Sequence, residues 1–262
     1  MLRLQQRVKI ERVNVLGVGI SVLNLKTAVA AIEEAVKNRA KGYICVTGVH
    51  GVMEAQESPA FRRVLNSAFL NTPDGMPMVW LGKLRGHGTM SRVYGPDLMQ
   101  DVFEWSRQSG CSHFFYGGQA GVAGELKAKV EAGYPGIAVR GFHSPPFRPL
   151  NEEEAAAFTA EIDRLRPDII WVGLSTPKQE KFMAEYLPKL NTTLMIGVGA
   201  AFNFYTGRTR QAPRWIQRSG FEWLYRLCQE PRRLWKRYLK NNPVFVLKII
   251  GQLTGLKRYS ID

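Results

Sequence analysis

Two loops of the chain place a polar side chain directly after a short apolar run. Asp74 follows the apolar residues 68–70 in a Thr-Pro-Asp-Gly-Met-Pro segment, and Gln179 follows the apolar residues 169–174 in a Ser-Thr-Pro-Lys-Gln-Glu segment. Each pattern is typical of a buried strand, a turn and a helix that begins near a proline. In an open α/β sheet, ligands bind where the carboxyl ends of the strands meet such turns. The two loops therefore offer a carboxylate and an amide to one ligand, although Pro-Asp-Gly is also a plain turn signature.

A glycine turn, Gly117 and Gly118, follows the strand-like residues 113–116 and precedes a helical stretch. It is similar to the dinucleotide fingerprint, in which glycines let backbone N–H groups approach a phosphate at a helix N-terminus. The next expected strand leads into residues 140–143, which offer no acidic residue for a ribose. A nucleotide diphosphate without nicotinamide therefore fits better than NAD, and a tight turn without a ligand is the alternative.

Further polar groups lie at expected strand ends and loops. Thr47 ends the apolar run 43–46, and Arg92 lies in a loop after Asp74, where a surface position is the alternative. The small residues of segment 197–207 permit close approach by a ligand or, equally, close helix packing. The sequence contains no Asp-x-Asp pair, which a metal-using nucleotide-sugar enzyme would want on the pyrophosphate. We therefore expect no metal and no cofactor, and we expect arginines to neutralise a leaving diphosphate.

The positive charge of the chain is concentrated toward its C-terminal end. The 262 residues carry a net charge of +14, and residues 207–258 hold thirteen Lys or Arg against two Glu, so this segment accounts for +11. Such a segment suggests an anionic partner: phosphate, nucleic acid or the inner-membrane surface. Between residues 223 and 240, aromatic residues and leucines alternate with cations, as in a helix that lies at a membrane interface. A helix packed on the body with a solvated basic face is the alternative.

The rest of the composition is that of an ordinary globular protein, with 45% hydrophobic and 22% charged residues. Three scattered cysteines without a CxxC spacing indicate neither a zinc site nor a disulfide framework, and a reducing cytoplasm is the simplest reading. No stretch has the apolar length of a signal peptide or a transmembrane helix. We expect a cytoplasmic protein attached peripherally to the inner face of the cell membrane.

The order of elements predicts a parallel, doubly wound α/β sheet, because strands alternate with helices. After about residue 207 the chain reads as helices broken by Gly220, Pro231 and Pro243. We expect an N-terminal extension (1–12), one α/β domain (13–218) and a basic amphipathic helical appendage (219–262). The expected strands are 13–18, 42–47, a short run into Asp74, 113–116, 137–141, 168–172 and 193–198. The expected helices are 26–38, 59–68, 76–84, 97–109, 120–131, 178–187 and one that Asn151 caps and that runs to Arg166.

Together these motifs resemble the WecG/TagA/CpsF family of bacterial glycosyltransferases, glycosyltransferase family 26. The resemblance covers roughly residues 13–240 and rests on ordered motifs: the strand ending in Thr47, Thr72 to Pro77, Arg92 to Leu98, Gly173 with Pro177 to Glu180, Gly197 to Gly207, and Glu222 to Arg233. It implies a Rossmann-like sheet and a metal-independent, inverting enzyme of cell-surface polysaccharide synthesis. Such an enzyme moves N-acetylmannosamine, or glucose or another hexose, from a UDP-sugar to an undecaprenyl-diphosphate-linked acceptor.

The resemblance also implies roles for single residues. Asp74 matches the catalytic base, and Thr47, Arg92 and Gln179 match polar residues of the active site. Asn203 matches a position near the nucleotide base. In the appendage, Arg226 and Arg233 match arginines that close over the site at the membrane. With the glycine turn included, the residues expected to bind the UDP-sugar are Gly117, Gly118, Gln179, Asn203, Arg226 and Arg233.

The chain departs from the family pattern after Thr47, where Val49 and His50 follow and an Asn two residues on is common in the family. The segment 140–143 also lacks the usual Gly-Tyr-Phe ending. The donor sugar, the acceptor sugar, the linkage, the pathway and a possible homo-oligomer are therefore left open. Two other classes remain in view. A nucleic-acid-binding protein would share the basic tail but not the paired loop residues, and an NAD-dependent Rossmann oxidoreductase would share the glycine turn. We expect no nucleic-acid partner.

Overall fold

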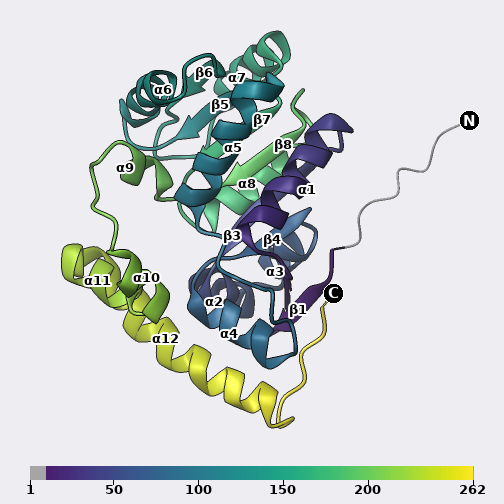
Figure 1. Cartoon of the computed structure of the whole chain (residues 1–262), viewed down its shortest axis with the longest axis vertical. Helices are drawn as coiled ribbons and strands as arrows, with labels where there is room; N and C mark the ends of the chain where they lie inside the picture. The colour runs from purple at the N-terminus through teal and green to yellow at the C-terminus, as the bar shows by residue number, and fades with distance from the viewer. Residues whose placement is uncertain (1–9, 262) are drawn as a thin grey trace, which may run out of the picture.

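The computed structural model describes residues 10–261. Residues 1–9 of the expected N-terminal extension and residue 262 of the expected appendage lie outside the described residues. Within this range, six parallel strands form one sheet in the order β4-β3-β8-β7-β5-β6 (Figure 1), which confirms the predicted α/β class. The strands are β3 (Gly42–Thr47), β4 (Leu70–Pro73), β5 (Ser112–Gly117), β6 (Ala138–His143), β7 (Ile169–Gly173) and β8 (Leu194–Gly197).

Helices cover both faces of this sheet, as a doubly wound sheet requires. Neighbouring residues of one strand point to opposite faces, so Ile44 of β3 packs in one apolar cluster and Cys45 in the other. The Ile44 face is covered by α1 (Leu25–Lys37), α5 (Gly95–Ser109), α6 (Val122–Gly133) and α9 (Ala201–Tyr205). The Cys45 face is covered by α2 (Val49–Glu57), α3 (Pro59–Asn66), α4 (Met76–Leu84), α7 (Glu152–Leu165) and α8 (Lys178–Tyr186).

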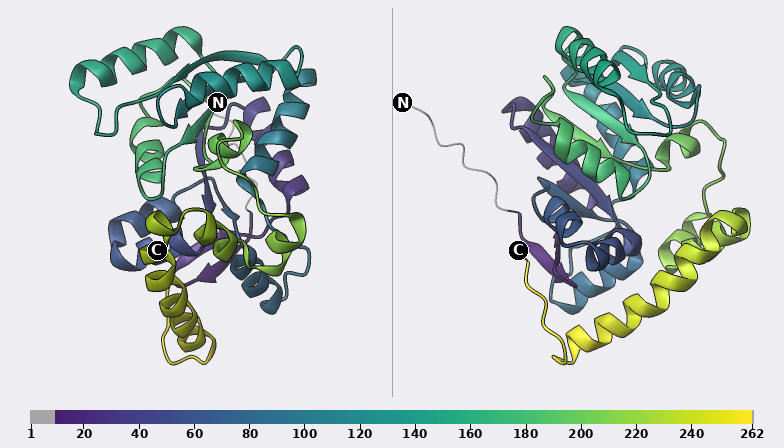
Figure 2. Two further views of the ribbon diagram at one scale, coloured as in Figure 1. Left: turned by 90° about the vertical axis from the view of Figure 1, so that its left-hand side faces the viewer. Right: turned by 180° about the vertical axis from the view of Figure 1, so that it is seen from behind.

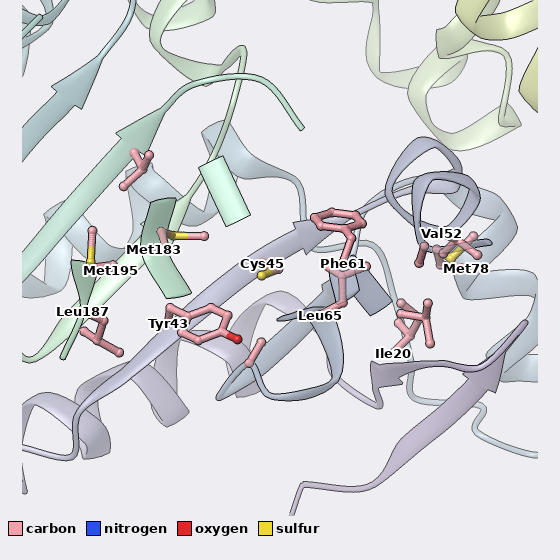
Figure 3. Packing of buried hydrophobic residues seen from close by; sticks show 14 of the residues in the cluster. Ile20, Tyr43, Cys45, Val52, Phe61, Leu65, Met78, Met183, Leu187 and Met195 are labelled. Carbon is pink, nitrogen blue, oxygen red and sulfur yellow. The ribbon is translucent and has the colours of Figure 1, made fainter. Parts of the chain in front are cut away.

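Figure 3 shows the Cys45 side of the core, where Phe61 and Leu65 of α3 and Met183 of α8 lie along β3 with Cys45. Burial of these side chains contributes about 25 cal/mol for each Å² of apolar surface removed from water.

Capping residues determine where the helices that flank the sheet begin. Asn151 caps α7 as predicted, because its side chain accepts from the Glu154 N–H while the Glu154 carboxylate accepts from the Asn151 N–H.

Two predictions about the N-terminal half are wrong. The expected strand 13–18 is a hairpin outside the parallel sheet, in which β1 (Arg12–Val15) pairs antiparallel with β2 (Val18–Ser21). Leu16 and Gly17 at its turn both have positive φ, as a two-residue hairpin turn requires. Leucine rarely adopts positive φ, so the sequence gives no sign of a turn at this position. Residues 49–57, which were not among the expected helices, form α2, whose N-cap Gly48 supplies no side-chain cap.

The C-terminal segment forms α10 (Arg214–Ser219), α11 (Glu222–Gln229) and α12 (Pro231–Leu253). Gly220 and Pro231 separate these helices as predicted, but Pro243 lies inside α12 and does not end it. The buried side chains of Phe245 and Ile249 hold this part of α12 against the core, which offsets the backbone hydrogen bond that a proline removes. Figure 2 shows α12 as one long helix beside the α/β body, with the chain returning from its end toward β1.

Candidate active site

A cavity of about 1540 Å³ lies at the carboxyl ends of β3, β4, β7 and β8, and α11 and α12 form another of its walls. Because the strands are parallel, their carboxyl ends meet at one edge of the sheet and bring residues far apart in sequence together. The cavity gathers nearly all the residues that the sequence singled out. Those that line it are Thr47, Asp74, Arg92, Gly118, Gln179, Asn203, Arg226 and Arg233.

Asp74 is held at the end of β4 by its own backbone and by Arg92. Its N–H donates to the carbonyl of Thr47 at 2.9 Å, and Gly48 leaves room for this approach, since a Cβ there would lie 2.8 Å from the Asp74 carbonyl oxygen. The Nε and Nη2 atoms of Arg92 donate to Oδ1 of Asp74 at 3.3 and 3.2 Å. Oδ2 has no hydrogen-bond partner among residues 10–261. One carboxylate oxygen is therefore anchored and the other is available to a ligand.

Arg92 is not the surface residue that the sequence allowed as an alternative. Its side chain is 15% exposed, lies over the ring of Tyr94 at 4.2 Å, and forms an ion pair with Glu222, in which Nη1 lies 2.6 Å from Oε2. Burial by itself would lower the pKa of Arg92, but the charges of Asp74 and Glu222 outweigh it and raise that pKa above its ordinary value. The guanidinium is a fixed cation between two carboxylates.

Thr47 and Asn71 form a buried polar pair on the neighbouring strands β3 and β4. The Thr47 hydroxyl donates to Oδ1 of Asn71, while the Asn71 N–H donates to the Ser21 hydroxyl at 3.0 Å. The hydroxyl proton of Thr47 is thus committed to Asn71. Its oxygen remains an acceptor toward the cavity that Thr47 lines.

Gln179 and Glu180 lie in the first turn of α8, and both are buried. The Gln179 Nε2 donates to Oε1 of Glu180 at 3.1 Å, and the Thr176 hydroxyl donates to the same oxygen at 2.8 Å. Burial raises the pKa of Glu180. The Gln179 Oε1 has no partner among the described residues, although its side chain is 2% exposed. A buried acceptor without a partner costs stability, which indicates a donor on a ligand.

The glycines at the end of β8 and just after it lie close to side chains of α8, Gln179 among them. A Cβ at Gly197 would lie 3.1 Å from the Gln179 Nε2, and a Cβ at Gly199 would lie 3.6 Å from its Oε1. Of the two alternatives that the sequence left open for this segment, close packing of a helix applies to these two glycines, because Gln179 belongs to α8. Asn203 follows on α9 and lines the same cavity.

The glycine turn is used differently from the expectation. Gly117 packs behind the cavity, because a Cβ there would lie 2.8 Å from the backbone of Gly173. The Gly118 N–H donates to the Gly173 carbonyl at 3.0 Å, so this N–H is already engaged within the protein. The turn has positive φ at both glycines and positions the ends of β5 and β7 against each other.

A cluster of arginines faces the strand ends from the C-terminal helices. Arg226 of α11 and Arg233 and Arg237 of α12 all line the cavity. Burial, and then the charges of Arg226 and Arg233, lower the pKa of Arg237 despite the opposing effect of Tyr238. The Nε atoms of Arg226 and Arg237 are buried without a partner among the described residues. Guanidinium donors that are buried without a partner can bind an anion.

Arg237 is a cavity-lining arginine that the sequence reasoning missed. The four-residue spacing from Arg233 places both side chains on one face of α12, and this spacing was the signal available in the sequence.

His50, where the chain departs from the family pattern, also lines the cavity, and its Nδ1 lies 3.1 Å from the Nδ2 of Asn241 on α12. Burial, followed by the charge of Arg237, lowers the pKa of His50 to about 4, so it is neutral at neutral pH.

Apolar side chains surround the mouth of the cavity and continue along α12. Four apolar residues line the cavity and are at least half exposed: Trp80 and Leu84 of α4, and Leu239 and Ile250 of α12.

None of the helices between residues 10 and 261 is both long enough and apolar enough to cross a bilayer. Over the same range, no group of three His, Cys, Asp or Glu side chains lies close enough together to hold a metal ion.

An open parallel sheet with a carboxylate, a buried amide and an arginine cluster at its carboxyl edge is typical of an α/β enzyme that acts on a phosphorylated substrate. The chain belongs to the glycosyl transferase WecG/TagA/CpsF family, whose model matches residues 13–259. This confirms the resemblance that its motifs suggested. The protein is a glycosyltransferase, and the nucleic-acid-binding and NAD-dependent classes are set aside.

Two relatives share most of the chain. It is 31% identical over 229 residues to the N-acetylglucosaminyldiphosphoundecaprenol N-acetyl-beta-D-mannosaminyltransferase of Bacillus spizizenii, and the match covers 86% of each chain. It is 29% identical over 196 residues to the enzyme of the same name from Bacillus subtilis (strain 168), a match that covers 75% of this chain and 74% of that enzyme.

Proposed function

We propose that this protein is an inverting glycosyltransferase that moves a sugar from a UDP-sugar to an undecaprenyl-diphosphate-linked sugar in cell-surface polysaccharide synthesis. The observation that carries the proposal is one cavity lined both by a carboxylate with a free oxygen, Asp74, and by two arginines whose Nε atoms are buried without a partner among the described residues, Arg226 and Arg237. The names of the two relatives support N-acetylmannosamine as the first choice of donor sugar. Glucose or another hexose is the second choice.

The chemistry requires one base. As the acceptor hydroxyl attacks the anomeric carbon, Asp74 takes its proton on Oδ2, and the bond from that carbon to the UDP oxygen breaks on the opposite side. This single displacement inverts the configuration. UDP is a good leaving group and needs no general acid. Thr47 and Gln179 supply acceptor oxygens that orient hydroxyl or amide groups of the sugars.

The negative charge that develops on the leaving diphosphate is met by fixed cations. Arg226, Arg233 and Arg237 would provide it with several charge-assisted hydrogen bonds, which are about twice as strong as neutral ones. Such donors are in place before the reaction and need no reorganisation during it. We therefore propose that catalysis uses no metal and that the UDP-sugar is bound by protein groups alone, with Asn203 near the nucleotide base.

The lipid of the acceptor gives the exposed apolar side chains a role. Trp80, Leu84, Leu239 and Ile250 line the cavity at its mouth, beside cations such as Arg233. We propose that this side of the protein rests on the inner face of the cell membrane, with aromatic and aliphatic groups among the lipid headgroups and cations on their phosphates. The helix α12 packs against α2, and in this proposal its other side lies on the lipid and not in solvent.

A direct test uses the purified protein, a short-chain polyprenyl-diphosphate-linked N-acetylglucosamine and UDP-N-acetylmannosamine, with UDP-N-acetylglucosamine and UDP-glucose as competing donors. Mass spectrometry of the acceptor identifies the transferred sugar, and NMR of the product gives its anomeric configuration. We expect one added sugar with a β-linkage from the α-linked donor. Retention of configuration, or hydrolysis of every donor without transfer, would refute the proposal.

A further inference from the structure

Glu222 is an unusual residue in the basic C-terminal segment, because its carboxylate points back into the α/β body. It lies in the first turn of α11, its side chain is 12% exposed, and it binds Arg92 at 2.6 Å. We propose that Glu222 is a positioning residue, which aligns the base Asp74 through Arg92 when α11 lies over the site. This inference rests on the proposed function, in which Asp74 is the base.

Three contacts define the orientation of Arg92. Its Nη1 forms an ion pair with Glu222, its Nε and Nη2 donate to Oδ1 of Asp74, and its Cζ lies over the ring of Tyr94. A guanidinium is planar and its donors form a rigid fork, so fixing one edge of the fork fixes the direction of the others. Glu222 therefore sets the edge that Arg92 presents to Asp74.

The pattern of contacts leaves the reactive oxygen free. Guanidinium groups prefer to bind a carboxylate with two parallel hydrogen bonds, one to each oxygen. Here both donors of Arg92 go to Oδ1 of Asp74, while Nη1 is held by Glu222. Without Glu222, Arg92 can rotate to bind both oxygens of Asp74. The acceptor hydroxyl would then lose Oδ2, the oxygen that must receive its proton.

Other ion pairs join the C-terminal helices to the body but do not lie at Asp74. Arg214 of α10 binds Asp97 of α5 at 2.7 Å, and Lys240 of α12 binds Glu57 of α2 at 2.6 Å. Arg214 and Lys240 are largely exposed, and exposed pairs of this kind contribute little to stability. The pair between Asp97 and Arg214 is a matched control for simple attachment, because it joins the same two parts of the chain.

The experiment compares Glu222→Gln with Asp97→Asn, using full-length protein and a short-chain soluble acceptor. We expect Glu222→Gln to lower kcat by about 10- to 100-fold, the scale of loss for a misaligned reacting group, with the KM for the UDP-sugar changed less than about twofold. Asp97→Asn should keep both constants. Binding of UDP to Glu222→Gln with wild-type affinity shows that the variant is folded. Unchanged kcat, or a rise in KM that Asp97→Asn shares, overturns the proposal.

A double-mutant cycle tests the route through Arg92. In an Arg92→Met background, adding Glu222→Gln should cause no further loss of kcat, because the residue through which Glu222 acts is gone. A second, multiplicative loss means that Glu222 acts elsewhere and overturns the proposal. Failure of the proposed function is seen separately, since then Asp74→Asn retains the turnover of the wild-type enzyme. If Asp74→Asn is inactive and Glu222→Gln is normal, the inference alone is wrong.

Discussion

Replacement of Arg237 by Gln tests whether this arginine binds the substrate or only stabilises the fold. Arg237 lines the cavity beside Arg226 and Arg233, and its Nε is buried without a partner among the described residues. A hydrogen bond to a charged group contributes about 1.5–3 kcal/mol. Since 1.36 kcal/mol corresponds to a factor of ten, losing one such bond to the diphosphate should lower kcat/KM by about 10- to 150-fold.

The stability of the ligand-free protein should not fall in the same variant, in contrast to its kcat/KM. Burial, together with Arg226 and Arg233, lowers the pKa of Arg237, which means that its charged form is disfavoured in the folded protein without ligand. Removing that charge should leave the melting temperature of the ligand-free protein at or above the wild-type value. A structural arginine would behave in the reverse way, with a lower melting temperature and a normal kcat/KM.

The assay is steady-state transfer to the short-chain acceptor, with melting followed by circular dichroism. Arg232→Gln is the matched control, because Arg232 lies on the same helix and is exposed. Titration with UDP adds an internal check: UDP should raise the melting temperature of Arg237→Gln less than that of the wild type. The reasoning is refuted if Arg237→Gln matches Arg232→Gln in both kcat/KM and UDP stabilisation.

Three further predictions concern metal, membrane and pH. Transfer should survive EDTA, and loss of activity that Mg²⁺ or Mn²⁺ restores would contradict the role given to the arginines. Arg232→Glu with Lys236→Glu should weaken sedimentation with anionic vesicles, by about 1 kcal/mol for each cation removed, while turnover on a short-chain acceptor changes little; Arg140→Glu, on the strand β6, is the control. The pKa of His50 is about 4 in the folded protein, against an ordinary 6.5. Between pH 6.5 and 4 the unfolded chain therefore binds a proton at His50 that the folded protein does not bind. The free energy of unfolding should fall by up to about 3 kcal/mol as the pH is lowered through this range. His50→Gln should reduce this fall in unfolding experiments across that range, and an unchanged fall would show that His50 is not buried in its neutral form.

The sequence was sufficient to predict a parallel α/β sheet and the polar residues that follow its strands. Asp74 and Gln179 could be predicted to lie at the same edge of the sheet, where both line the cavity, because strand, turn and helix signals lie next to each of them and parallel strands end at one edge. The sheet order could not be predicted in this way, because it depends on which strands pair over long range. The hairpin β1–β2 was missed because its turn places Leu16 at positive φ, against the usual preference of leucine.

The contacts of the site were harder to predict than its members. Arg92 and Glu222 are 130 residues apart in the chain, and only the placement of α11 brings them together. Truncation of the C-terminal helices is unsuitable as a test of membrane binding, because it would remove Phe245 and Ile249 from the core. Point substitutions of exposed cations test membrane binding without that loss.

The central claim, that Asp74 is the base, is tested most directly by Asp74→Asn. Asn keeps the size of the side chain and can still accept from Arg92, but it does not take up the proton of the acceptor hydroxyl. We predict that turnover falls by about 10²-fold or more, while the Kd for UDP, measured by calorimetry, stays within about twofold of the wild-type value. Turnover close to that of the wild-type enzyme in the purified, folded variant would contradict the account.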